Sequence, residues 1–172
     1  SGRMSDVSGG CITCVIEGTR PILAEVQGLV AATGFGNARR TATGFDCNRL
    51  NLLLAVLEKR LGLYYSNLDT YLNIVGGIRI DEPAADLAVA LSLVSGLRDI
   101  PLPDDLVAFG EIGLSGELRS VPRAQARITE AARMGFKQCV LPFACLKQIT
   151  SCPDTIKLIG VRRLSEAVSL IR

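Results

Sequence analysis

The stretch Gly76–Gly96, with the sequence GGIRIDEPAADLAVALSLVSG, decides the fold of this chain. Its first part alternates apolar and charged residues, which is typical of a β-strand over Gly77–Ile80. After an acidic turn and a proline, an almost wholly apolar run predicts a helix over Ala84–Val94. Because apolar residues occur on every side of this helix, we expect it to lie at the centre of the fold and to be covered by other elements.

Three carboxylates surround the start of the predicted central helix, namely Asp81, Glu82 and Asp86. Negative charge at a helix N-terminus interacts favourably with the helix dipole, and this is the interpretation that we favour for all three. The alternative is a catalytic role for one or more of them.

The flanking segments begin with β-patterns alone and then alternate between strand and helix patterns. Apolar or β-branched runs predict strands at Gly10–Glu17, Pro21–Ala31, Tyr71–Val75, Leu106–Gly110, Gln138–Leu141 and Ile156–Ile159, and a loop is predicted over Thr33–Gly44. Further helices are predicted from an N-cap at Asp46 to a stop at Gly62, and over Pro122–Met134, Pro142–Lys147 and Leu164–Ile171. A tight hairpin is predicted over Glu111–Glu117. This order predicts an α/β (α+β) domain in which helices pack on a mixed β-sheet.

A chain of 172 residues is most simply one domain, which we place at residues 10–172. Residues 1–9 begin Ser1-Gly2-Arg3 before Met4, and we expect them to be an expression-vector remnant and linker. The apolar runs are too short to span a membrane, and the first ten residues lack the apolar core of a secretory signal. The sequence therefore predicts a cytoplasmic location without a membrane partner.

The chain has no histidine, which excludes His-dependent catalytic triads and His-ligated zinc. The six cysteines include Cys11 and Cys14, which have the C-x-x-C spacing of some zinc and redox sites. These two residues lie in a predicted strand, where alternation directs their thiols to opposite faces. We therefore favour small core residues in a reducing cytoplasm over a metal or redox site.

The positive charge of the chain is carried by fifteen arginines and only four lysines. Arginine suits bidentate contact with phosphate, and an arginine loop before a helix predicts contacts to a DNA backbone. The predicted DNA-binding residues are Arg39, Arg40 and Arg49, which lie close together in the sequence, and, as weaker candidates, Arg98, Arg123 and Arg127. The alternative is that they pair with carboxylates of a neighbouring subunit or are simply solvated.

Several long strings of this sequence match one known family. They are Glu17–Pro21 (EGTRP), Arg39–Asp46 (RRTATGFD), Asn48–Leu50 (NRL), Leu54–Arg60 (LAVLEKR), Asn73–Gly77 (NIVGG) and Phe109–Arg119 (FGEIGLSGELR). On these residues the chain resembles the C-terminal Lon-protease-like domain of the RadA (Sms) family of bacterial DNA repair and recombination proteins. The resemblance covers essentially all of residues 10–172 and implies a Lon proteolytic-domain-like fold.

The resemblance also implies a longer protein with a zinc finger and a RecA-like ATPase core. Neither a Walker A loop nor a four-cysteine zinc pattern occurs in this chain, so ATP, magnesium and zinc are expected only in those other domains. The family is implied to be a hexameric motor that drives branch migration in homologous recombination, with DNA and RecA as partners.

Active Lon domains carry Pro-Ser-Ala-Gly at the start of the buried helix, where the serine is the nucleophile, and a lysine base follows later in the chain. The matching residues here begin at Pro83, so Ala84 replaces the serine, and our alignment places Gln125 at the lysine position. A methyl group cannot attack a carbonyl and glutamine has no titratable amine. We therefore expect no enzyme in this chain.

The function that we expect is a proteolytically inactive scaffold, which supports hexamer assembly and the binding of double-stranded or branched DNA. One alternative is a purely structural oligomerisation module without DNA contact. A Ser-Lys peptidase is the least favoured alternative.

Overall fold

The computed structural model describes residues 6–34 and 36–172, so residues 1–3, which we expected to be vector-derived, lie outside the described part. The strands are β1 (Gly10–Glu17), β2 (Arg20–Ala32), β3 (Arg40–Thr43), β4 (Leu68–Ile74), β5 (Leu106–Ala108), β6 (Glu111–Ile112), β7 (Leu118–Arg119), β8 (Gln138–Pro142) and β9 (Lys157–Val161). The α-helices are α1 (Cys47–Leu61), α2 (Asp86–Arg98), α3 (Ala124–Arg133) and α4 (Leu164–Val168), and the 3₁₀ helices are η1 (Pro83–Ala85) and η2 (Phe143–Gln148).

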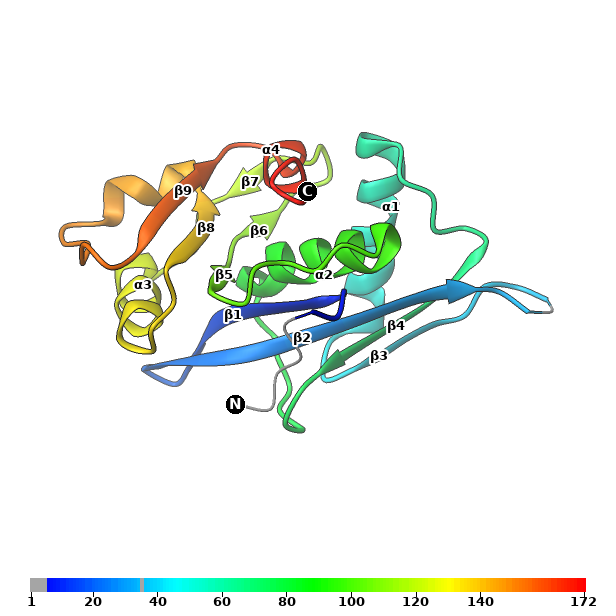
Figure 1. Ribbon diagram of the computed structural model, residues 1–172, viewed down its shortest axis with the longest axis horizontal. Coiled ribbons are helices and arrows are strands. Elements are labelled where there is room, and N and C mark those ends of the chain that lie inside the picture. Colours follow the sequence, from blue (N-terminus) through cyan, green and yellow to red (C-terminus); the bar gives the residue numbers. More distant parts are fainter. Residues whose placement is uncertain (1–5, 35) are drawn as a thin grey trace.

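A seven-stranded sheet with the order β3-β4-β2-β1-β5-β8-β9 forms the main layer, and β6 and β7 form a separate hairpin. Strand β2 pairs antiparallel with both β1 and β4. The other neighbouring strands of the main sheet run parallel. The sheet is therefore mixed and carries packed helices, which confirms the predicted α/β class (Figure 1).

The two faces of the sheet bury two separate apolar clusters. Along β1, Cys11 and Val15 belong to the cluster formed with α1 and α2, whereas Ile12 belongs to the cluster formed with α3. This division follows from strand alternation, which turns successive side chains to opposite faces. Helix α2 packs against β1 and β2, with α1 beside it, and Figure 1 shows it in the middle of the fold.

The predicted central helix is confirmed, with a 3₁₀ turn at its start. The turn η1 leads into α2, and every α2 residue from Asp86 to Ser95 is buried. A helix that is covered all round needs apolar or small side chains on every face, and this explains its sequence. The predicted helix caps of α1 are also confirmed. The Asp46 side chain accepts a hydrogen bond from the Asn48 N–H, and Gly62 ends α1 in the left-handed conformation.

The predicted strand over Gly77–Ile80 is wrong. Gly76 and Gly77 both have positive φ and form a turn, and the following residues are extended without a ladder. The Ile80 N–H donates to the Gly44 carbonyl at 2.8 Å, which holds this segment by one hydrogen bond. The alternation of isoleucine with arginine here reflects an extended connection in which Ile80 is buried and Arg79 is exposed.

The predicted loop over Thr33–Gly44 contains a strand. Residues Arg40–Thr43 pair in parallel with β4 at the edge of the sheet. Strand β3 has only four residues, and these alternate between half-buried and exposed. Such a short strand at the edge of a sheet lacks the apolar run that identifies a buried strand. The β-branched Thr41 and Thr43 were the available signal.

Candidate functional site

Ala84, which we expected at the position of a Lon nucleophile, lies in an apolar environment. Ala84 lies in η1, is 2% exposed and belongs to the apolar cluster that includes Phe109 and Ile128. Its carbonyl accepts a hydrogen bond from the Gly110 N–H at 2.7 Å, and the Gly110 carbonyl accepts one from the Leu87 N–H at 3.0 Å. The start of the central helix is therefore fixed to the connection between β5 and β6, and Ala84 itself contributes no reactive group.

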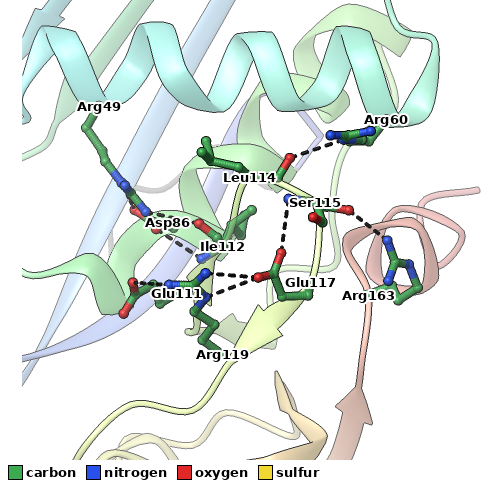
Figure 2. A network of polar contacts seen from close by, with 10 residues as sticks. All are labelled: Arg49, Arg60, Asp86, Glu111, Ile112, Leu114, Ser115, Glu117, Arg119 and Arg163. Atoms are coloured by element: carbon green, nitrogen blue, oxygen red, sulfur yellow. Dashed lines mark hydrogen bonds and ion pairs between the residues drawn. The ribbon is translucent and has the colours of Figure 1, made fainter.

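On one side of Ala84, a buried ion pair joins the start of α2 to the first turn of α1. The Asp86 side chain is fully buried, forms an ion pair with Arg49, and accepts the Arg49 Nε–H at 3.0 Å. The same carboxylate accepts the Ile112 N–H at 3.1 Å, and Arg49 also donates to the Ile112 carbonyl at 3.1 Å (Figure 2). Burial raises the pKa of the Asp86 carboxyl, and the hydrogen bond from Arg49 opposes this shift. The pair thus ties α1, α2 and the β6–β7 hairpin together.

On the other side of Ala84, a second ion pair joins the residue before η1 to helix α3. Glu82 pairs with Arg127, whose side chain is only 1% exposed. The Arg127 guanidinium also donates to the Cys14 carbonyl at 2.8 Å and to the Pro122 carbonyl at 3.1 Å. It lies 5.7 Å from the centre of the Phe109 ring, a distance typical of a cation–π contact. This arginine is a fully engaged core residue.

These two pairs bear on the predictions for four residues. Glu82 and Asp86 are held by arginines, and Asp86 also lies in the first turn of α2, where the helix-dipole interpretation places it. Because Arg127 is buried, it cannot contact DNA, and the suggestion that it is solvated is wrong as well. The donors of Arg49 are directed to Asp86 and Ile112, which leaves its guanidinium engaged within the fold. No local sequence pattern indicates either ion pair, because the partners are 37 and 45 residues apart in the chain.

The predicted counterpart of the lysine base, Gln125, faces a different loop. Its amide donates to the Ser151 carbonyl at 2.7 Å, and its side-chain oxygen accepts the N–H groups of Thr150 at 2.9 Å and Ser151 at 3.2 Å. This pattern is typical of a side chain that fixes a loop. The four lysines are all exposed.

The remaining predicted DNA-binding arginines lie at separate places on the surface. Arg39 is exposed beside the edge strand β3, and Arg40 is half-buried and donates to the Tyr65 carbonyl at 3.4 Å. Arg98 is exposed at the C-terminal end of α2. Arg123 has a φ of 60° as the N-cap of α3, and its side chain donates to the Thr19 carbonyl at 2.7 Å. The structure therefore does not gather the six predicted arginines into one cluster, and the left-handed Arg123 places Pro122 before α3, outside the first turn that we predicted.

Two pockets lie on either side of the segment that leads into η1. One, of about 230 Å³, is lined by residues that include Asp46, Arg49 and Asp86. The other, of about 350 Å³, lies between this segment and the end of β1. Three of the polar residues that line these pockets, Arg49, Asp86 and Glu82, are engaged in the ion pairs described above.

Four of the six cysteines, Cys11, Cys14, Cys139 and Cys145, are buried core residues, and Cys47 is half-buried. Cys152 is exposed, so the interpretation as a core residue is wrong for it. Cys11 and Cys14 are both buried, and burial raises the pKa of the Cys14 thiol to about 12. A thiol with so high a pKa is protonated at neutral pH and is a poor nucleophile or metal ligand. Within residues 6–34 and 36–172, no group of three or more cysteine, aspartate or glutamate side chains is arranged to hold a metal ion. In the same residues, no helix combines the length and the hydrophobicity that a membrane crossing needs.

The curated proteins that are most similar among those compared here share one name. The chain is 50% identical over 167 residues to the DNA repair protein RadA of Bacillus subtilis (strain 168), covering 96% of this chain and 36% of that protein. It is 47% identical over 163 residues to the DNA repair protein RadA of Escherichia coli (strain K12), covering 95% of this chain and 35% of that protein. For the DNA repair protein RadA of Streptococcus pneumoniae (strain ATCC BAA-255 / R6), the identity is 48% over 169 residues, which cover 98% and 40%.

A family profile described as "Subunit ChlI of Mg-chelatase" matches residues 69–145, which include η1, α2 and the β6–β7 hairpin. The chain spans little more than a third of the length of the curated relatives that it matches. With 47–50% identity over nearly its whole length, the chain is a homologue of one part of the bacterial proteins named DNA repair protein RadA.

Proposed function

We propose that this chain is a proteolytically inactive, Lon-like scaffold domain of a DNA repair protein. It supports the assembly of a hexamer and binds double-stranded or branched DNA during homologous recombination and branch migration. The name shared by its relatives supports the DNA repair part of this proposal. Under the same proposal, ATP, magnesium and zinc bind in the part of the longer protein that this chain does not span. RecA is a partner, and the protein works in the cytoplasm.

The observation that carries the inactive-protease proposal is the chemistry around Ala84. A buried methyl group occupies the nucleophile position, and the two carboxylates beside it are bound to arginines. A Ser-Lys mechanism needs a hydroxyl and a neutral amine within hydrogen-bond distance of each other. At the expected base position, the hydrogen bonds of Gln125 go to Thr129 and to the loop at Thr150 and Ser151.

The peptidase alternative is tested by incubating this chain with denatured casein and following the release of acid-soluble fragments. We expect no release above that of a heat-denatured sample of the same chain. Release that persists after further purification and stays in proportion to the amount of this chain would show that the scaffold proposal is wrong about activity.

DNA binding is proposed to use the exposed Arg39 and the neighbouring Arg40. The Arg39 N–H donates to the Asp69 carboxylate at 2.7 Å, which holds the backbone of this segment while the side chain points to solvent. We expect this chain to bind labelled duplex DNA with an affinity that falls steeply with salt, because phosphate contacts release counterions.

The matched variants for this test are Arg39→Ala/Arg40→Ala and Arg79→Ala/Arg133→Ala. Arg79 and Arg133 are exposed and already paired with Asp81 and Glu130, so their loss controls for two positive charges at sites without a proposed DNA contact. We expect the first variant to bind more weakly and the control to bind like the parent. Equal binding by the first variant and the parent would remove Arg39 and Arg40 from the DNA contact.

A purely structural oligomerisation module is the second candidate, and one observation favours it. Leu29 of β2 and Tyr71 of β4 are directly opposed in the sheet and are 61% and 37% exposed. They line a pocket of about 360 Å³ on the sheet. We expect light scattering to show a chain that self-associates, and Leu29→Glu to shift it to smaller species. Self-association without any DNA binding would favour this candidate over the first.

A further inference from the structure

Two arginines from different elements hold the tip of the β6–β7 hairpin. Arg60, in the last turn of α1, donates through Nε to the Leu114 carbonyl at 3.1 Å. Arg163, just before α4, donates through Nη2 to the Ser115 carbonyl at 2.7 Å. Figure 2 shows both side chains directed at the hairpin tip from separate elements. Because the two carbonyls are consecutive, the tip brings together two positive side chains that are 103 residues apart in the sequence.

The two side chains converge on Gly116. A Cβ placed on this glycine would lie 3.6 Å from the Arg60 Cβ and 4.0 Å from the Arg163 Nη2. The glycine also has a φ of 82°, a conformation that other residues rarely adopt. The turn therefore favours glycine at this position because of its φ, and the distances show that both arginine side chains lie against this residue.

Among the described residues, neither Arg60 nor Arg163 forms an ion pair with a carboxylate. The nearest acidic side chain of the hairpin, Glu117, is bound to Arg119 and to the Ser115 N–H (Figure 2). The Glu166 carboxylate accepts the backbone N–H groups of Arg162 and Arg163. Carboxylates close to the tip are therefore engaged elsewhere, and the two guanidinium charges lack a counter-ion.

The arrangement leaves most of the donor capacity of both arginines open. A guanidinium has five N–H donors, and the contacts to the hairpin use one from each. Both residues are exposed. The hydrogen bonds to backbone carbonyls already order the two side chains, so that less side-chain conformational entropy is lost when a ligand binds. Two like charges held close together repel each other, and a bound anion would relieve that repulsion.

We propose that the hairpin-tip arginines, Arg60 and Arg163, bind phosphate groups of a duplex DNA backbone. This inference rests on the DNA binding in the proposed function and gives it a second site, outside the six arginines considered from the sequence. The planar fork of arginine matches phosphate oxygens, which favours phosphate over other anions. Backbone contacts of this kind position DNA without reading its sequence. Binding at this site is therefore independent of DNA sequence and sensitive to salt.

The test compares this chain with Arg60→Gln/Arg163→Gln and with the control Arg79→Gln/Arg133→Gln. The control removes the same charge from two exposed arginines that are paired with Asp81 and Glu130. Each protein is titrated into a labelled duplex of mixed sequence at several sodium chloride concentrations. We expect the hairpin-tip variant to lose affinity on the order of tenfold and its salt slope to fall by about 2, one for each lost phosphate contact. We expect the control to lose much less.

A charge-keeping variant, Arg60→Lys/Arg163→Lys, separates DNA contact from a merely structural role. We expect it to bind DNA more tightly than the glutamine variant even if both unfold at a lower temperature than the parent. If the glutamine double variant does not fold, the two single glutamine variants take its place, and each is expected to lower the salt slope by about 1.

The outcomes separate this inference from the function on which it rests. If the unaltered chain binds duplex DNA and the hairpin-tip variant binds equally well, the site is wrong and the proposed DNA binding stands. If the control loses as much affinity as the hairpin-tip variant, only net charge matters and the site is wrong. If the unaltered chain does not bind duplex DNA at any salt concentration, the DNA part of the proposed function fails together with the site.

Discussion

Two groups of arginines in this domain are in opposite physical environments. Arg49 and Arg127 lie beside Ala84, form ion pairs with carboxylates and are largely withdrawn from solvent. Arg60 and Arg163 lie at the hairpin tip, are exposed and donate to backbone carbonyls. The comparison shows that the number of arginines in a sequence does not predict ligand binding. The partner of each guanidinium in the fold must also be known. The first group ties together the segments around Ala84, and the second group keeps N–H donors that are not used within the fold.

The largest effect that would sharpen this comparison is expected for Arg127→Ala. The change removes a buried charge, leaves Glu82 without its partner and leaves the Cys14 carbonyl without a donor. Losing one member of a buried ion pair costs about 3–5 kcal/mol in the free energy of unfolding. Urea denaturation measures this difference. A decrease in the free energy of unfolding of less than about 1 kcal/mol would contradict the prediction, because such a small effect is typical of exposed residues.

The control for this prediction is the double variant Glu82→Gln/Arg127→Met, which removes both charges and keeps most of the side-chain volume. We expect it to be more stable than Arg127→Ala, because no isolated charge is left behind.

A smaller effect, with a dependence on pH, is expected for Arg49→Ala. The Asp86 carboxylate loses its charged partner while it stays buried, and we expect a loss of about 2–4 kcal/mol near neutral pH. Burial already raises the pKa of Asp86, and removing Arg49 raises it further.

A carboxyl with a raised pKa holds its proton more tightly in the folded state than in the unfolded state. The folded state therefore loses relative stability as pH rises from the unfolded value, about 4, through the raised folded value. Consequently the penalty of Arg49→Ala should shrink on acidification toward pH of about 4. Urea titrations at several pH values measure it, with Arg133→Ala as control. A penalty that grows on acidification would contradict a raised pKa for Asp86.

The smallest effect is expected for Arg133→Ala. Arg133 and Glu130 form a pair at the surface of α3, where water and salt screen the charges. We expect no measurable change in thermal unfolding temperature at physiological ionic strength. A clear loss of stability would show that exposure is a poor guide to the energetic role of arginines in this domain.

The sequence predicted the helices and most strands of this fold because their signals are local. The cap at Asp46, the stop at Gly62 and the apolar run of α2 each depend on neighbouring residues alone. The edge strand β3 was missed because an exposed, four-residue strand carries little apolar pattern. The predicted strand over Gly77–Ile80 failed because a period of two also describes an extended connection that has no ladder partner.

The candidate site was predicted less well than the fold, for a reason that its arginines make plain. Sequence reasoning grouped Arg39, Arg40 and Arg49 by their proximity in the chain, whereas each guanidinium is governed by groups that are distant in sequence. The partner of Arg49 is Asp86, and that of Arg127 is Glu82. The hairpin-tip arginines escaped notice because neither lies near the other until the chain folds.

The sequence by itself determined that residues 84 and 125, which we match to the nucleophile and the base of Lon domains, are alanine and glutamine, and that a buried helix begins between them. These are matters of residue identity and local pattern, which no packing can change. Only the tertiary structure decided which arginines form ion pairs with Glu82 and Asp86 and which donate only to backbone carbonyls at the hairpin tip. The physical reason is that the environment of a charge depends on burial and on the nearest opposite charge, and both are set by contacts between distant segments.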